Sequence, residues 1–250
     1  MPSLGIFGDS FATIHHNNSE HGWSYKIQEQ FDKVGVHALN AASNDWIVNQ
    51  FINLHNNYDR IVIVWSSSAR IWHPIEAFNK LSGKDVLLQF WLAGMDMDLL
   101  LRTHRVKSIK AIHAIKDMLD YVIPNEDALR TTDLIMLAGI KQIRPDAVII
   151  PAFGDTAEVC HYAHEGYANW NLFKIQRAQY SIIKEGLGPD PLANHLSKEN
   201  NKWMLEHVLS RLDGKFLDWD PDNWHSFKSK KELEDYKDKT YPDYKPIKYF

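Results

Sequence analysis

Three short runs of consecutive apolar residues limit the fold of this chain more than any other feature. They extend from Leu4 to Gly8, from Asp59 to Trp65 and from Asp146 to Phe153. Continuous apolarity, in contrast to an alternation of apolar and polar residues, indicates strands that are covered on both faces of a sheet. A shorter run from Val36 to Leu39 is a candidate for a fourth strand.

Helical patterns fill much of the sequence between these runs. Apolar residues recur every three or four positions, and the segments with this spacing are 23–34, 47–54, about 99–122, about 127–143 and 198–212. Strands that alternate with helices predict an α/β fold, a three-layer α/β/α sandwich with a mostly parallel sheet of flavodoxin type. In such folds, ligands bind beyond the carboxyl ends of the strands.

Two segments depart from this alternation. Residues 74–145 are too many for one crossover helix, so we expect them to form a helical insertion that roofs the ligand site. Residues 213–250 are charged and aromatic, and we predict an irregular C-terminal tail that wraps the domain or reaches a partner. The expected organisation is one α/β domain over residues 1–212, followed by this tail.

Composition excludes several classes of protein. The chain has 250 residues, a net charge of −4 and one cysteine, so it offers neither a basic surface for nucleic acid nor an intramolecular disulfide. The first residues lack the basic and apolar regions of a signal peptide. No apolar run approaches the roughly 20 residues that span a bilayer. We therefore expect a cytoplasmic protein without a membrane span.

The first apolar run ends in Gly8, Asp9 and Ser10, which allow two interpretations. One is a turn that closes the strand, because glycine, aspartate and serine are common in turns. The other is a nucleophile, because a turn at this point would expose the hydroxyl and direct backbone N–H groups at a reacting carbonyl. In the second case a neighbouring base has to take the hydroxyl proton.

His195 is the best placed of the thirteen histidines to be that base. It precedes the last helical segment, and a loop entering that helix can direct the imidazole over the strand ends. Asp190 lies five residues upstream and is a candidate to hold the Nδ1–H group and stabilise the imidazolium. A histidine beside a helix cap, with no catalytic role, is the alternative.

These two motifs resemble those of the SGNH (GDSL-type) hydrolases, which are α/β esterases, lipases and deacetylases. In that superfamily the catalytic serine lies in the first sequence block and the histidine in the last. The chain reads G-D-S-F-A at 8–12, A-S-N-D-W-I at 42–47, W-S-S-S-A-R at 65–70 and N-H-L-S-K-E-N-N at 194–201, each where a block of the family would fall. The likeness to the superfamily spans roughly residues 3–212, and the exact residues within the blocks resemble those of small phage-encoded members.

The resemblance implies that Ser10 is the nucleophile and that His195 is the general base. It also implies an oxyanion hole, to which the second block of the family contributes a glycine N–H group. This chain has Ala41 and Ala42 at that place, so one of them would have to serve. Asn44 is a candidate to replace the asparagine amide that the family carries in its third block.

The third block of this chain offers hydroxyl groups, from Ser66, Ser67 and Ser68. Arg70 follows them and is a candidate either to bind a substrate carboxylate or to form a structural ion pair. The family places its acid three residues before the histidine, a position that is leucine here, so Asp190 would need a longer loop to reach the imidazole.

We therefore predict a serine esterase or deacetylase that removes a small acyl group from an ester or an acylated glycan, without a cofactor. One alternative is a non-catalytic binding protein with the same scaffold, such as a virion or host-interaction protein. Another is an unrelated α/β fold in which Ser10 only forms a turn. The histidines at 15, 16, 161 and 164 lack the further ligands of a metal site, and the sequence leaves the oligomeric state open.

Overall fold

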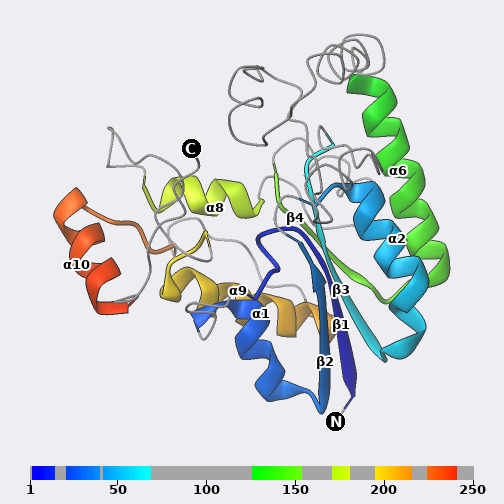
Figure 1. The fold of residues 1–250 in the computed structure, drawn as a ribbon, viewed down its shortest axis with the longest axis horizontal. Coiled ribbons are helices and arrows are strands. Elements are labelled where there is room, and N and C mark those ends of the chain that lie inside the picture. The colour runs from blue at the N-terminus through cyan, green and yellow to red at the C-terminus, as the bar shows by residue number, and fades with distance from the viewer. Residues whose placement is uncertain are drawn as a thin grey trace, which may run out of the picture.

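A four-stranded parallel sheet organises the protein (Figure 1). The computed structural model describes residues 2–14, 21–39, 42–68, 126–153, 171–180, 195–215 and 224–240. The strands in these ranges are β1 (Ser3–Gly8), β2 (Lys33–Ala38), β3 (Arg60–Trp65) and β4 (Val148–Pro151). Their order is β2-β1-β3-β4, and every neighbouring pair is parallel. The predicted parallel sheet is confirmed.

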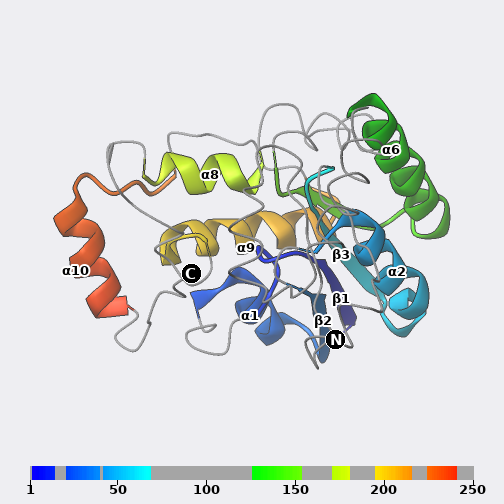
Figure 2. The ribbon, with the colours of Figure 1, turned by 45° about the horizontal axis from the view of Figure 1, so that its top comes forward.

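Helices cover both faces of the sheet, as Figures 1 and 2 show. On one face lie α2 (Asn44–Leu54) and α6 (Glu126–Ile143). On the other face lie α1 (Trp23–Lys26), α8 (Leu172–Ala178) and α9 (Lys198–Leu212). Each face buries its own cluster of apolar side chains, so the predicted three-layer α/β/α sandwich is also confirmed.

The side chains of β3 alternate between the two apolar cores. Ile61, Ile63 and Trp65 belong to the core beneath α2 and α6. Val62 and Val64 belong to the core beneath α1 and α9. All five are fully buried. A strand covered on both faces has no polar side, which is the physical reason for its continuous apolar sequence.

Helix α9 begins and ends where its sequence pattern predicts. Ser197 caps its amino end, because its Oγ accepts a hydrogen bond from the Asn200 N–H group at 3.2 Å. Val208 and Leu212 of the predicted stripe are buried, whereas Leu205 and Leu209 of that stripe are only partly buried. This helix fixes the position of the residues immediately before it, which include His195.

The prediction of a helix reaching Val34 is wrong. Helix α1 continues as a short 3-10 segment, Ile27–Gln30, and the backbone becomes extended at Phe31. Strand β2 then begins at Lys33, three residues before the predicted strand, and Val34 pairs with a residue of β1. Pairing with β1 outweighs the helical spacing here, because a β-branched residue fits a sheet at least as well as a helix.

Helix α6 confirms the predicted helix over about 127–143, but its setting differs from the expected insertion. Its Leu137 and Ile140 are buried in the same core as α2, so α6 covers the sheet. This part of the segment 74–145 therefore packs on the sheet, directly before β4. The helix predicted over about 99–122 lies outside the described residues.

The prediction of an irregular C-terminal tail is wrong for its middle part. Residues Lys230–Thr240 form helix α10, and its Leu233 is buried. The hydroxyl of Tyr236, one turn later, accepts a hydrogen bond from the Lys198 N–H group at 2.5 Å. Two inward-facing residues three positions apart dock an otherwise charged helix, and this pattern is too short to recognise in the sequence.

Candidate active site

A tight turn follows β1 and contains Ser10. The Ala12 N–H group donates to the carbonyl oxygen of Asp9 at 2.9 Å, and the Phe11 N–H group donates to Oδ1 of Asp9 at 3.0 Å. Asp9 and Phe11 are buried, whereas Ser10 between them is partly exposed. Its hydroxyl makes no hydrogen bond with another described residue. The turn therefore leaves Ser10 partly exposed at the carboxyl end of β1.

Gly8 is needed in this turn because of close packing. A Cβ atom added there would lie 2.8 Å from Cβ of Val64 and 2.9 Å from Cβ of Ala12. Its backbone does not have a positive φ, so left-handed geometry is not the reason for the glycine. The missing side chain allows the turn of Ser10 to fold back against β1 and β3.

A buried polar network lies beside this turn and joins the ends of β1 and β3. Ser66, the first residue after β3, donates from Oγ to Oδ2 of Asp9 at 3.1 Å. The Ser66 N–H group donates to Oδ1 of Asn44 at 2.8 Å, and Nδ2 of Asn44 donates to the Ser66 carbonyl oxygen at 3.0 Å. Asn44 begins α2, so three elements are held together beneath the candidate site.

Asp133 of α6 completes this network and was missed in the sequence analysis. Its Oδ2 accepts hydrogen bonds from Nδ2 of Asn44 at 3.0 Å, Nε1 of Trp65 at 3.2 Å and Oγ of Ser68 at 2.5 Å. Asp133 is 3% exposed. The sequence does contain a sign of this role. Asp133 lies four residues before Leu137 and therefore on the apolar stripe of the helix, where a buried charge is costly unless it is paired.

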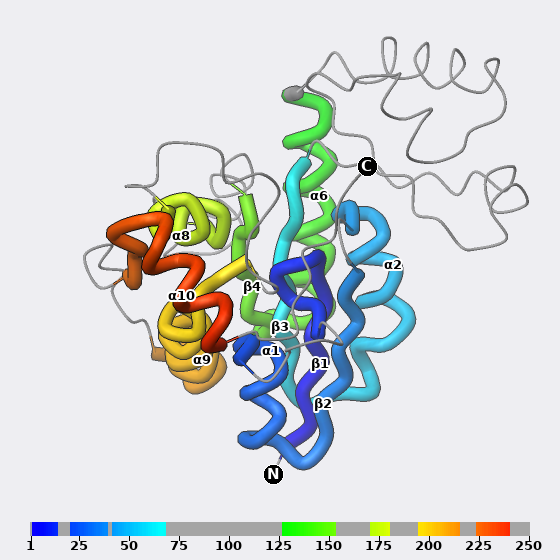
Figure 3. The backbone as a smooth tube through the Cα atoms, turned by 60° about the vertical axis from the view of Figure 1, so that its left-hand side comes forward, coloured from blue at the N-terminus to red at the C-terminus, as the bar shows by residue number. Residues whose placement is uncertain are grey.

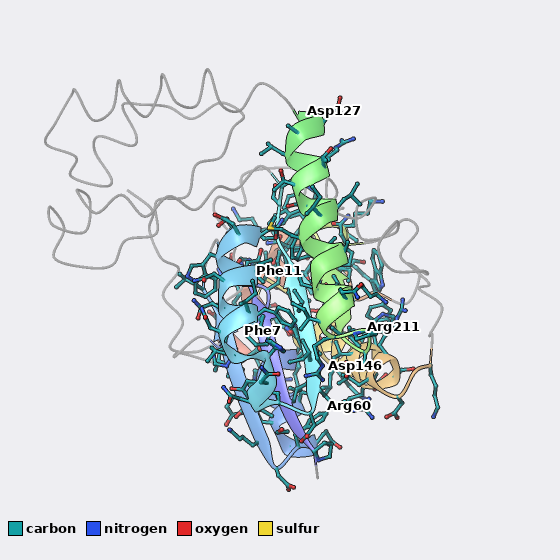
Figure 4. All side chains as sticks on the ribbon, turned by 90° about the vertical axis from the view of Figure 1, so that its right-hand side faces the viewer. Phe7, Phe11, Arg60, Asp127, Asp146 and Arg211 are labelled. Carbon is teal, nitrogen blue, oxygen red and sulfur yellow. The ribbon has the colours of Figure 1, made fainter. Side chains whose placement is uncertain are left out.

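His195 lies against the Ser10 turn. The centroid of its imidazole is 4.6 Å from that of the Phe11 ring, with 41° between the planes. Figure 4 shows Phe11 beyond Phe7, past the carboxyl end of β1. Figure 3 shows the chain before α9 approaching this end of the sheet. Two segments that are distant in the sequence are thus neighbours beyond the strand ends.

Two glutamines associated with α8 contact His195. Nε2 of Gln176 lies 3.4 Å from Nδ1 of the imidazole, and Nε2 of Gln179 donates to the His195 carbonyl oxygen at 2.7 Å. The backbone of His195 has a φ of 60°, in the left-handed region. Such a conformation is uncommon for residues other than glycine and is often found at functional sites. Neither contact could be predicted from the sequence.

Some of the other residues predicted for the site are buried and hydrogen-bonded within the protein, and the rest lie outside the described residues. Ala42 is buried, and its N–H group donates to the Leu39 carbonyl oxygen at 3.0 Å. Both amide hydrogens of Asn44 are engaged by the Ser66 carbonyl and Asp133. Ser67 is 3% exposed, next to the network. The remaining predicted residues lie outside the described ranges: Ala41, Arg70 and Asp190.

Comparisons with known proteins identify similar structures but no family by sequence. No family model matches the chain, and no curated protein matches it. The structure is similar to a psychrotrophic esterase, EstA, from Pseudoalteromonas sp., with 9% identity, a TM-score of 0.41 and coverage of 85% of this chain and 97% of the other.

A second similar structure is a protein from Desulfitobacterium hafniense DCB-2, described as lipolytic and of the G-D-S-L family. It shares 17% identity, with a TM-score of 0.36 and coverage of 84% of this chain and 98% of the other. The α/β sandwich follows from the strand order and the helix layers described above.

Two kinds of feature are absent from the described residues. No helix in the described ranges is long and apolar enough to cross a membrane. Within the same ranges, no group of three or more histidine, cysteine, aspartate or glutamate residues is arranged to hold a metal ion.

Proposed function

We propose that this protein is a serine ester hydrolase of the SGNH type, with Ser10 as the nucleophile and His195 as the general base. The ring contact between Phe11 and His195, with centroids 4.6 Å apart, carries this proposal. It brings the residue adjacent to Ser10 against the imidazole, at the carboxyl ends of parallel strands where ligands bind in open α/β sheets. Both Ser10 and His195 are partly exposed.

The proposed reaction has two steps. In the first, Oγ of Ser10 attacks the ester carbonyl carbon while His195 takes the hydroxyl proton, and the alcohol leaves with that proton as the acyl-Ser10 ester forms. In the second, His195 takes a proton from water, hydroxide adds to the acyl carbon, and the proton returns to Oγ as the carboxylic acid is released. The imidazole is unchanged after a full cycle.

The N–H group of Ser10 is the backbone donor that we propose for the developing oxyanion. The neighbouring N–H groups of Phe11 and Ala12 already donate to Asp9. Ser10 has no such hydrogen bond with another described residue. A donor fixed in a turn contributes most when negative charge develops on the carbonyl oxygen, because it needs no reorganisation.

The substrate that we propose is a small acyl ester, such as an acetyl ester of an alcohol or of a glycan. The Asp9 carboxylate and the Ser66 hydroxyl bind each other beneath the turn, so they support Ser10 and do not compete for the substrate. Asp190 as the acid that orients His195, Arg70 as a substrate contact and Ala41 as an oxyanion donor stay predictions from the sequence.

A non-catalytic binding protein is the second candidate, and two observations favour it. The Ala42 N–H group and both amide hydrogens of Asn44 are engaged within the protein, so neither is available to an oxyanion without rearrangement. In addition, Ser10 Oγ forms no hydrogen bond with His195. Catalytic hydrogen bonds are often long before the substrate binds, which is why the hydrolase remains the first proposal.

Covalent labelling separates the two candidates. The folded protein is treated with a fluorophosphonate probe, and the labelled peptide is identified by mass spectrometry; hydrolysis of p-nitrophenyl acetate is measured in parallel. We expect labelling of Ser10, with loss of labelling and activity in Ser10→Ala and His195→Ala. Ser3→Ala is the matched control, because Ser3 lies at the opposite end of the same strand.

An unlabelled but correctly folded wild-type protein would favour the binding function. Labelling that persists in Ser10→Ala would show that another residue is the nucleophile. In both variants, circular dichroism has to match the wild type, so that the loss of reactivity is not a loss of folding.

A further inference from the structure

Gln179 occupies an unusual position for a glutamine, fully buried at the carboxyl end of α8. Its side chain makes three hydrogen bonds. Nε2 donates to the His195 carbonyl oxygen at 2.7 Å, and Oε1 accepts from the Ser197 N–H group and from Nδ2 of Asn200, both at 2.9 Å. One amide thus binds the chain on both sides of residue 196.

These contacts stabilise a backbone conformation that the sequence does not favour. His195 has a φ of 60°, where the Cβ atom of an L-residue is crowded by the backbone. The His195 carbonyl oxygen and the buried Ser197 N–H group, two residues apart, can both bind one amide only if the chain turns at this point. Gln179 supplies both partners, and its hydrogen bonds therefore favour this turn.

The same helix also contacts the imidazole. Gln176, three residues before Gln179, places its amide 3.4 Å from Nδ1 of His195. On the other side the ring packs against Phe11, beside Ser10. The direction of the imidazole therefore depends on two things. Gln179 holds the His195 backbone, and the imidazole itself contacts Gln176 of α8 and Phe11 of the Ser10 turn.

Residues near the C-terminus, His225 and Phe227, bind the same group of side chains and backbone atoms. The carbonyl oxygen of Gln179 accepts a hydrogen bond from the Phe227 N–H group at 2.8 Å. Asn200 forms two hydrogen bonds with the backbone of His225. Nδ2 of Asn200 donates to the His225 carbonyl oxygen at 3.0 Å, and the His225 N–H group donates to Oδ1 of Asn200 at 2.9 Å. Phe227 is fully buried, so water does not compete for these bonds at that position.

We propose that Gln179 is a positioning residue for His195: its amide holds the backbone of residues 195–197 so that the imidazole faces the Ser10 turn. This inference rests on the proposed function, in which His195 is the general base. A small displacement of a base from its proton donor reduces the rate strongly, while substrate binding is affected less. The expected signature is therefore a loss in kcat with little change in KM.

Gln179→Met tests the inference, because methionine has a similar length and volume and no amide. We expect kcat for p-nitrophenyl acetate to fall at least tenfold, with KM within twofold of the wild type. We also expect the nuclear Overhauser contact between the Phe11 and His195 rings to weaken or disappear. Asn171→Ala is the matched control, because Asn171 caps the amino end of the same helix α8 through the Lys174 N–H group and forms no hydrogen bond with His195.

Gln179→Glu provides a second test, in which the pH profile of kcat is compared with that of the wild type at pH values where both proteins are folded. A protonated carboxyl group can replace both amide functions, whereas the carboxylate cannot donate to the His195 carbonyl oxygen. We expect the ratio of the variant's kcat to that of the wild type to be close to one at lower pH and to fall at higher pH, where the wild type keeps its rate. The titratable groups near Gln179 include His195, the adjacent Tyr180, the pair His225 and Glu199, and Tyr236.

The outcomes distinguish this inference from the proposed function. A folded Gln179→Met with the kcat and ring contact of the wild type would overturn the positioning role. So would a Gln179→Glu variant whose pH profile matches that of the wild type. If the wild type itself shows no esterase activity, the proposed function fails, and the ring contact in Gln179→Met still decides whether Gln179 positions His195. If Gln179→Met does not fold, Gln179→Glu decides.

Discussion

His207, in the middle of α9, is a buried histidine that should make this protein sensitive to acid. Its side chain is fully buried, and its imidazole stacks on Trp203 with the ring centroids 5.6 Å apart and 6° between the planes. Burial, together with the positive charge of Arg211, lowers the pKa of His207 from 6.5 to about 3. The folded protein thus keeps this imidazole neutral at pH values where the unfolded chain protonates it.

The size of the effect follows from that difference. Because the folded pKa is the lower one, the unfolded state binds more protons as the pH falls, and the free energy of unfolding decreases. At about 1.4 kcal/mol per pH unit, the loss reaches at most about 5 kcal/mol and is complete only below the folded pKa of about 3. Between pH 7.5 and pH 5 the same relation gives a loss of roughly 2 kcal/mol.

His207→Phe tests this calculation, because phenylalanine can keep the stacking on Trp203 but does not titrate. Urea denaturation, followed by circular dichroism, gives the free energy of unfolding of both proteins at pH 7.5 and pH 5. We expect the wild type to lose about 2 kcal/mol more than the variant over this interval. Trp203→Phe is the control, since it weakens packing without removing the titrating group. Equal losses in the wild type and in His207→Phe would refute the reasoning.

Two further predictions concern the turn and the network of the candidate site. Gly8→Ala places a Cβ atom 2.8 Å from Cβ of Val64, so we expect a loss of about 1–3 kcal/mol in thermal or urea denaturation and weaker fluorophosphonate labelling of Ser10. Asp133→Ala leaves the buried donors of Trp65 and Asn44 without their acceptor, and we expect it to cost about 3 kcal/mol. Asp133→Asn, which keeps an acceptor oxygen, should cost less in the same urea titration; an equal cost would contradict the assigned hydrogen bonds.

The elements that the sequence predicted well are those whose burial is regular along the chain. Strand β3 is covered on both faces and is continuously apolar, and α9 buries one stripe and has its serine cap at Ser197. The apolar pattern did not predict the elements in which only a few side chains are buried. Val34 is compatible with the spacing of a helix and of a strand, and it lies in a strand because it pairs with β1. Helix α10 packs on the protein mainly through Leu233 and Tyr236.

The candidate site was predictable in part, for the same reason. Ser10 follows the first strand and His195 precedes the last helix, so their place at the carboxyl edge follows from the order of the elements. Their supporting groups do not follow from it. The bond from Asn44 to Asp133 joins residues 89 positions apart, and the bond from Gln179 to His195 starts from a helix that the sequence did not reveal.

The sequence by itself determined the alternation of strands and helices, because the period of apolar residues is a local property of the chain. Only the tertiary structure decided which polar groups meet. The order β2-β1-β3-β4 brings Asp9, Ser66 and Asn44 to one edge, and the packing of α8 and α9 turns His195 toward Phe11. A buried polar side chain needs a partner, and the identity of that partner depends on how distant segments pack.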